Sequence, residues 1–206
     1  MKIKPKTNQY NDITYHHFDN QSDKICFMFS GTGYTYDKPL LYYPTLLMLE
    51  LGYNVVHVCY EFQQSQFEQT PEEISKMVQQ VVQPIVNYCI ASKSYTEAIY
   101  FGKSLGTLPI VDFYIQQQSD IPCRFILLTP LLSLTHVMQN LQNKHAFIAI
   151  GTNDPHYSQE RVAALSSHQL TVIDNADHSL EIIGDIDTSI TICHTLVNAL
   201  KTYLQQ

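Results

Sequence analysis

The residues most suited to chemistry form a short motif around one serine, Gly102-Lys103-Ser104-Leu105-Gly106. An apolar, strand-like run at 98–101 precedes it directly, and a segment with helical spacing follows. A serine on a tight turn between strand and helix needs small neighbours, because the backbone there is strained and passes close to adjacent strands. Such a turn also directs the amide of Leu105 toward an oxyanion that forms beside the serine. The motif therefore predicts that Ser104 is a nucleophile.

The motif has two other interpretations. The first is an ordinary glycine-bounded turn capped by serine. The second is the end of a phosphate-binding loop, which requires a glycine five residues before Gly102. That position holds Glu97, so the phosphate-binding interpretation fails.

A serine hydroxyl is a poor nucleophile at neutral pH and needs a base, which in turn needs an orienting partner. Asp154 follows the apolar run 146–150, and His178 follows the run 170–173. The three residues occur in the order serine, aspartate, histidine, with gaps of 50 and 24 residues. Each is expected at the carboxyl end of a strand, where doubly wound sheets build their sites. The sequence thus predicts a triad with Ser104 as nucleophile, His178 as base and Asp154 as orienting acid.

Several neighbouring groups give alternatives. Asp154 precedes Pro155 and could be a turn former or a helix cap, and Asp177 is the second candidate for the acid. His156 is expected to be a surface residue at a helix start that could line the site. The pair His16-His17 is expected away from the site, and with no matching ligand cluster no metal is predicted.

The elements that would position these residues alternate between short apolar runs and longer helical segments, the rhythm of a parallel sheet covered on both faces. Six strands are expected, with a possible antiparallel edge strand at 13–18; they lie at 25–30, 54–60, 98–101, 125–129, 146–150 and 170–173. Helices are expected at 44–51, at 71–92 with a kink or break at Pro84, and from about Thr188. About sixteen residues separate the fourth and fifth runs, too few for a cap domain.

The composition excludes several classes of function. The chain has 206 residues, a formal net charge of −7 and 45% hydrophobic residues, which predicts one folded domain over 1–206 and no nucleic-acid partner. No run approaches the length of a membrane span, and the N-terminus has no secretory signal, so a cytoplasmic location is expected. The five cysteines include no CxxC pair and are expected to be small buried hydrophobes.

With these motifs in place, the chain resembles the α/β-hydrolases, specifically the small capless esterases similar to dienelactone hydrolase, from about Lys24 to Leu204. The resemblance implies a doubly wound, mostly parallel sheet of about six or seven strands with helices on both faces and no cap domain. It also implies that the loop from Ser30 to Tyr34 is the oxyanion loop, with the amide of Thr32 acting beside that of Leu105. Many relatives begin this loop with His-Gly, whereas this chain has Ser30-Gly31, so Gly33 is the alternative donor.

The expected activity is hydrolysis of a small-molecule carboxylic ester or thioester through an acyl-enzyme, with no cofactor. Dienelactone hydrolases themselves use cysteine, and Ser104 indicates general ester or thioester chemistry instead. Tyr34 and the tyrosines that follow it either pack the first helix or wall a substrate pocket. An acyl thioesterase and a catalytically silent binding protein on the same scaffold are the alternatives.

Overall fold

The computed structural model describes residues 3–206, which build one eight-stranded sheet in the order β1-β2-β4-β3-β5-β6-β7-β8. The strands are β1 (Lys6–Tyr10), β2 (Ile13–Phe18), β3 (Lys24–Phe29), β4 (Asn54–Val58), β5 (Glu97–Lys103), β6 (Cys123–Leu128), β7 (Phe147–Gly151) and β8 (Gln169–Ile173). Strands β3 to β8 pair in parallel, which confirms the mostly parallel sheet. The single domain over 1–206 stays a prediction, and residues 1 and 2 lie outside the described part.

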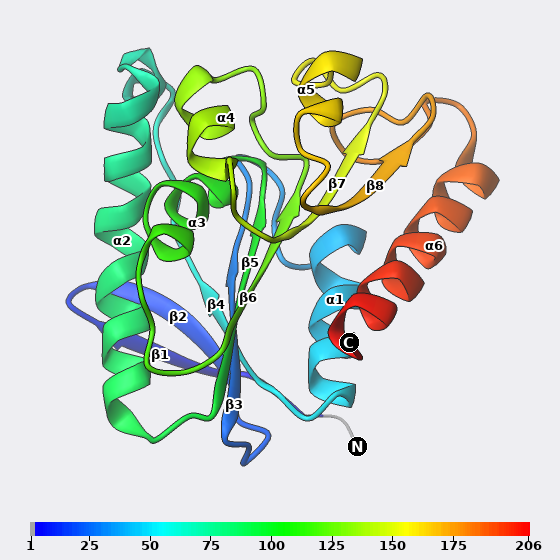
Figure 1. The fold of residues 1–206 in the computed structure, drawn as a ribbon. Coiled ribbons are helices and arrows are strands. Elements are labelled where there is room, and N and C mark those ends of the chain that lie inside the picture. The colour runs from blue at the N-terminus through cyan, green and yellow to red at the C-terminus, as the bar shows by residue number, and fades with distance from the viewer. Residues whose placement is uncertain (1–2) are drawn as a thin grey trace.

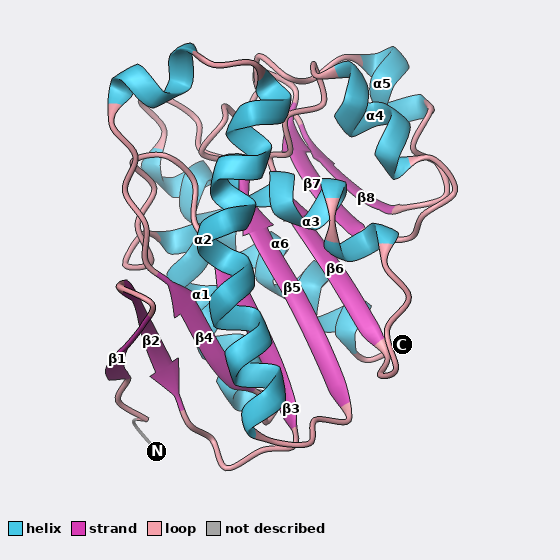
Figure 2. Ribbon diagram, turned by 90° about the vertical axis from the view of Figure 1, so that its left-hand side faces the viewer, coloured by secondary structure: helices cyan, strands magenta, loops and turns pink. Residues whose placement is uncertain are grey.

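The antiparallel end of the sheet differs from the prediction, because β2 is not the edge strand. β2 pairs with β4 on one side and with β1 on the other, and Figure 2 shows this hairpin at one end of the sheet with β8 toward the other. The turn between β1 and β2 is Asn11-Asp12, with φ values of 48° and 60°, the left-handed geometry that tight hairpins favour. β1 was missed because its sequence, KTNQY, has no apolar face and none of its residues is buried.

Helices cover both faces of the sheet, as predicted (Figure 1). On one face lie α2 (Pro71–Ser92), α3 (Leu108–Asp112) and α4 (Thr135–Leu141); on the other lie α1 (Pro39–Glu50) and α6 (Ile186–Leu204). Strand alternation explains the two cores: Phe27 and Phe29 belong to one hydrophobic cluster, and Cys26 and Met28 belong to the other. All four side chains are fully buried.

The structure differs from the sequence prediction at two prolines, Pro44 and Pro84. Helix α1 begins at Pro39 rather than Pro44, because Leu40 and Leu41 are buried and anchor an additional first turn. Helix α2 continues through Pro84 without a break. Its buried residues on both sides of the proline, Val82 and Ile85 among them, pack on the sheet and outweigh the lost backbone hydrogen bond.

A capping box of two residues begins α2. The side chain of Thr70 accepts a hydrogen bond from the amide of Glu73, and the Glu73 carboxylate accepts one from the amide of Thr70. At the end of α1, Gly52 takes a φ of 83°, a left-handed conformation that costs glycine little.

The carboxyl edge of the sheet carries only short elements. The connection from β6 to β7 contains the seven-residue α4 and no cap domain. The short helix α5 (Gln159–Ala163) follows β7, and 3-10 helices lie at η1 (Gln64–Glu68), η2 (Ser104–Thr107) and η3 (Tyr114–Gln116). None of the helices within residues 3–206 combines the length and the apolar character that crossing a bilayer requires.

Candidate active site

Ser104 lies on a strained turn at the carboxyl end of β5. Its φ of 53° is in the left-handed region, where a residue with a side chain costs about 1–2 kcal/mol. A methyl group at Gly106 would lie 2.2 Å from the carbonyl oxygen of Phe29, and one at Gly102 would lie 2.5 Å from the carbonyl oxygen of Gly106. Only glycine fits at either position, so the turn can pass between its neighbouring strands with Ser104 at its apex.

Asp154 lies three residues beyond β7 and is almost fully buried, with 3% of the residue exposed. Its loop packs directly against the loop that follows β8. A methyl group at Gly151 would lie 2.0 Å from the carbonyl oxygen of Ala176, and the amide of Asn153 donates a hydrogen bond to that same oxygen. Gly151 thus permits the contact that brings the aspartate loop and the histidine loop together.

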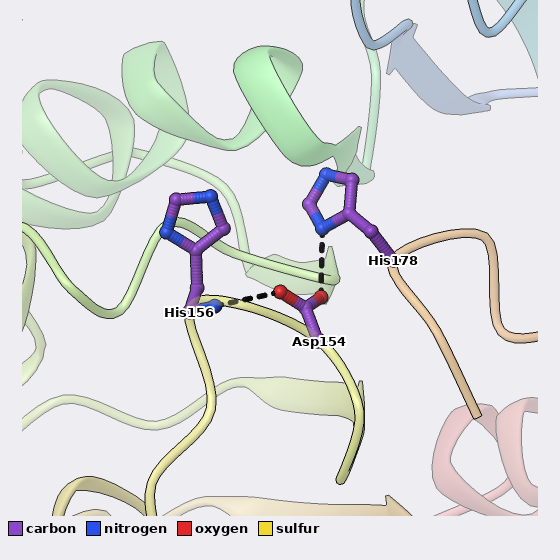
Figure 3. Close-up of side chains that lie close together, drawn as sticks. All are labelled: Asp154, His156 and His178. Carbon is purple, nitrogen blue, oxygen red and sulfur yellow. Dashed lines mark hydrogen bonds and ion pairs between the residues drawn. The ribbon is translucent and has the colours of Figure 1, made fainter. Parts of the chain in front are cut away.

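His178 lies five residues beyond β8 and connects the other two side chains. Its Nδ1 is 2.7 Å from Oδ2 of Asp154, and its Nε2 is 2.7 Å from Oγ of Ser104. Figure 3 shows the ring of His178 directed at the Asp154 carboxylate, with His156 on the other side of that carboxylate. The structure therefore brings the three sequence-predicted residues into one hydrogen-bonded chain.

The charge on Asp154 fixes the proton positions in this chain. Burial alone would raise the pKa of its carboxyl, but hydrogen bonds from the His178 ring and the His156 amide outweigh burial and lower that pKa below its ordinary value. An ionised carboxylate only accepts hydrogen bonds, so Nδ1 of His178 carries the proton. The lone pair of Nε2 then faces the hydroxyl of Ser104, the arrangement that a general base requires.

Asp177, the second candidate for the acid, has a different role. Its carboxylate accepts hydrogen bonds from the amides of Ser179 and Glu181 at 2.7 and 3.1 Å. These bonds close the loop that carries His178. Asp177 therefore shapes the loop, whereas Asp154 contacts the imidazole.

His156 borders the chain of three residues. Its amide donates to Oδ1 of Asp154 at 2.8 Å, and its ring centre is 5.5 Å from that of His178. Asp154, His156 and His178 each offer one ligand atom within 4.8 Å of the others, a donor set that metals accept. Most of these donor atoms already have a partner: both carboxylate oxygens and both ring nitrogens of His178 are hydrogen bonded, and Nδ1 of His156 lies 2.6 Å from Oγ of Ser133.

Lys103, the residue before the serine, is a part of this site that sequence reasoning missed. It is 2% exposed, and its Nζ donates a hydrogen bond to the carbonyl oxygen of His178 at 3.0 Å. The same ammonium lies 4.6 Å from the ring centre of Tyr34. The sequence feature that could have indicated this role is a lysine inside an otherwise small and apolar turn motif. Its burial, however, depends on loops that are far away in the sequence.

Thr32 and Leu105, whose amides are expected to bind an oxyanion, both line one pocket, and Leu105 directly follows Ser104. Leu105 is the second residue of η2, so its amide has no partner within that helix. Gly31 brings the first loop against the serine, because a methyl group at Gly31 would lie 3.1 Å from Cβ of Ser104. Gly33, the alternative donor, also lines the pocket and has a φ of 65°.

This pocket has a volume of about 530 Å³ and is lined mainly by the loop after β3, the segment after β4 and Leu105. Phe62 and Phe67 line it, although they lie in a Gln-rich segment whose polar composition is typical of a surface loop. Two phenylalanines within a polar run are the sequence feature that could have predicted this aromatic side of the pocket. His16 also lines the pocket, contrary to the expectation that it lies away from the site.

The structure does not bring Tyr34 to this pocket. Tyr34 is 5% exposed, belongs to the hydrophobic cluster under α1 and accepts a hydrogen bond from the amide of Leu40 at 3.1 Å. Its surroundings favour the helix-packing interpretation over a place in the substrate pocket. Tyr36, two residues later, does line the pocket.

Solved structures that superpose on this chain identify its fold. An alpha-beta serine hydrolase homologue from Coxiella burnetii superposes with a TM-score of 0.68 at 14% identity, covering 97% of this chain and 98% of its own. The chain has the α/β-hydrolase fold. Est1E from Butyrivibrio proteoclasticus has this α/β-hydrolase arrangement too, with a TM-score of 0.64, 12% identity and coverage of 96% and 99%.

A third structure with the α/β-hydrolase fold is the esterase Pf2001 from Pyrococcus furiosus, with a TM-score of 0.63, 16% identity and coverage of 98% of this chain and 92% of its own. No protein-family model matches the sequence, and no curated protein matches it. The likeness is therefore one of three-dimensional arrangement over nearly the whole of each chain. Within the α/β-hydrolase fold of this chain, the three hydrogen-bonded residues follow β5, β7 and β8 at one edge of the sheet.

Proposed function

We propose that this protein is a serine hydrolase that cleaves carboxylic esters of small molecules through an acyl-enzyme on Ser104. The observation that carries the proposal is the chain from Ser104 through His178 to Asp154, with 2.7 Å at both hydrogen bonds. The names of the structural relatives Est1E, described with bound ferulic acid, and Pf2001, described as an esterase, support an ester substrate.

In the first half of the reaction, Oγ of Ser104 attacks the carbonyl carbon of the ester while its proton moves to Nε2 of His178. The carbonyl electron pair moves to the oxygen and forms a tetrahedral oxyanion. Asp154 stabilises the imidazolium, because its carboxylate accepts a hydrogen bond from Nδ1. When the oxyanion collapses, the carbon–oxygen bond to the alcohol breaks and Nε2 protonates the leaving alcohol.

In the second half, His178 removes a proton from a water molecule, which attacks the acyl-enzyme carbonyl. Collapse of the second tetrahedral intermediate releases the carboxylic acid and returns the proton to Oγ of Ser104. The amides of Leu105 and Thr32 would bind the oxyanion in both halves, and one such donor contributes about 10²–10³ in kcat. These steps use side chains and amides of this chain together with water.

Two further candidates share the scaffold. An acyl thioesterase would use the same steps with a sulfur leaving group, and a binding protein would retain substrate without turnover. The hydrogen bond of 2.7 Å between Nε2 and Oγ favours an enzyme over a silent binding protein. A cytoplasmic location, which the sequence predicts, is part of the proposal.

The test combines a fluorophosphonate probe with p-nitrophenyl esters of two to twelve carbons. We expect the wild-type protein to bind the probe covalently and to hydrolyse at least one ester, and Ser104→Ala to do neither. Equal labelling of both proteins would overturn the assignment of the nucleophile. Tight binding of esters without hydrolysis by the wild type would support the binding protein instead.

A further inference from the structure

The pocket of about 530 Å³ beside Ser104 lies on one side of the proposed reaction centre. Its lining residues fall between positions 16 and 67, with Leu105 as the single later residue. None of the lining residues comes from the loops that carry Asp154 and His178. The pocket is therefore built from the proposed oxyanion loop and its neighbours, and not from the loops of Asp154 and His178.

This placement decides which half of an ester the pocket can hold. The leaving oxygen must lie within reach of Nε2 of His178, because that nitrogen gives it a proton. The carbonyl oxygen must lie beside the amides proposed to bind the oxyanion, and the residues that supply them, Thr32 and Leu105, both line the pocket. The remaining substituent of the carbonyl carbon is the acyl chain, and the pocket is the space that the residues beside the proposed oxyanion site offer to it.

Aromatic side chains form the wall of the pocket. The ring centres of Tyr60 and Phe62 are 5.3 Å apart, and those of Phe62 and Phe67 are 6.2 Å apart in an edge-to-face arrangement. The hydroxyl of Tyr60 donates a hydrogen bond to the carbonyl oxygen of Ser30 at 2.7 Å and so fixes this wall to the oxyanion loop. A surface of this kind binds alkyl or aryl groups by excluding water.

The charged groups in the lining are two exposed carboxylates, Asp37 and Glu61, together with the imidazole of His16. Within residues 3–206, no lysine or arginine lines the pocket. Lys38 is close enough to contribute to the lowered pKa of Asp37, after the hydrogen bond from Thr35, but its ammonium lies 5.2 Å from the ring centre of Tyr34. These two carboxylates give the pocket a negative electrostatic potential. Lys38 partly offsets the charge of Asp37, so Glu61 contributes more to that potential.

We propose that this pocket binds the acyl group of the substrate and selects uncharged alkyl or aryl acyl groups over acyl groups that carry a carboxylate. The selection has two physical causes: an anionic group would lose hydration against the aromatic wall, and the carboxylates of Asp37 and Glu61 would repel it. The inference rests on the proposed ester hydrolysis and adds the class of substrate. It disfavours dicarboxylic acid monoesters.

The test compares two esters of equal chain length, p-nitrophenyl hexanoate and mono-p-nitrophenyl adipate, at low ionic strength. We expect kcat/KM of the wild type to be at least about tenfold higher for hexanoate. In the double variant Asp37→Asn/Glu61→Gln, the ratio of adipate to hexanoate should rise about threefold to tenfold. Asp120→Asn removes an exposed carboxylate near the start of β6, outside this pocket, and should leave the ratio unchanged.

A binding measurement separates failure of this inference from failure of the proposed function. Calorimetric titration of Ser104→Ala with methyl hexanoate and with monomethyl adipate should show tighter binding of the uncharged ester. Equal kcat/KM values for the two p-nitrophenyl esters, equal binding of the two methyl esters, or binding of neither would overturn the inference. Preferential binding of methyl hexanoate by a protein that hydrolyses no ester would support the pocket and contradict only the hydrolase.

Discussion

The ammonium of Lys103 donates a hydrogen bond to the backbone carbonyl oxygen of His178 at 3.0 Å. The residue directly before the proposed nucleophile therefore holds the residue proposed as its base. Burial lowers the pKa of Lys103 to about 8, although the nearby carboxylates of Asp154 and Asp177 act in the opposite direction. A buried ammonium is costly, and here it ties the turn after β5 to the loop after β8.

Replacing this ammonium should disturb the position of His178. We expect Lys103→Met to lower kcat about tenfold to a hundredfold with a smaller change in KM, because a shift of the base by about 1 Å misaligns proton transfer. The matched control is Lys93→Met, since Lys93 also donates to a backbone carbonyl, that of Ser22 at 2.8 Å, but at the other edge of the sheet. Steady-state kinetics with a p-nitrophenyl ester measure both, and an unchanged kcat for Lys103→Met would contradict a positioning role.

The lowered pKa of Lys103 also predicts how stability depends on pH. The folded state loses the lysine proton near pH 8, whereas the unfolded chain keeps it to about pH 10.4. The unfolded state binds more protons in that window, so this group makes the free energy of unfolding rise with pH there. Relative to Lys103→Met, the wild type should therefore gain about 2 kcal/mol between pH 7 and pH 10. Urea unfolding of both proteins at each pH measures this difference, and a constant difference would show that the ammonium is not buried.

The two aspartates near His178 should respond differently to the same substitution. Asp154→Asn should lower kcat by about 10⁴, because the amide no longer holds the imidazole in the required tautomer. Asp177→Asn keeps an oxygen that can accept from the amides of Ser179 and Glu181, so its kcat should stay within about tenfold of wild type. The reverse order of the two effects in an ester hydrolysis assay would assign the acid to Asp177.

The turn that presents Ser104 depends on a glycine that has no room for a side chain. Gly106→Ala would place a methyl group 2.2 Å from the carbonyl oxygen of Phe29 and should destabilise the fold by at least about 3 kcal/mol. Gly184→Ala is the comparison, since Gly184 has a φ of 82° but open space around it, and should cost only about 1–2 kcal/mol. Urea unfolding distinguishes the two, and a loss for Gly106→Ala no larger than that for Gly184→Ala would show that the close contact at Gly106 is relieved at little cost.

Much of the architecture follows from local sequence patterns. The buried parallel strands are apolar runs such as 25–29, and the glycines around Ser104 mark a turn that excludes every larger residue. The spacing of Asp154 and His178 after two late strands places both at the same edge as Ser104. These features are readable because strand burial and tight turns impose strict residue types over a few positions.

The features that the sequence did not predict depend on contacts between distant segments. Strand β1 is polar and is defined by its pairing with β2 rather than by its own residues. Phe62 and Phe67 lie in a Gln-rich segment, and only the packed fold turns them toward the pocket. In the sequence Lys103 resembles an ordinary solvated lysine, and its burial follows only from its contact with the loop of His178.

The most direct test of the central claim is to capture the acyl group on Ser104. Wild-type protein mixed rapidly with p-nitrophenyl hexanoate should release a burst of p-nitrophenolate of about one equivalent per protein where deacylation limits turnover. Acid quenching followed by peptide mass spectrometry should then find the hexanoyl group on Ser104. Hydrolysis that persists in Ser104→Ala at the wild-type rate, with no acylated peptide in either protein, would contradict the account.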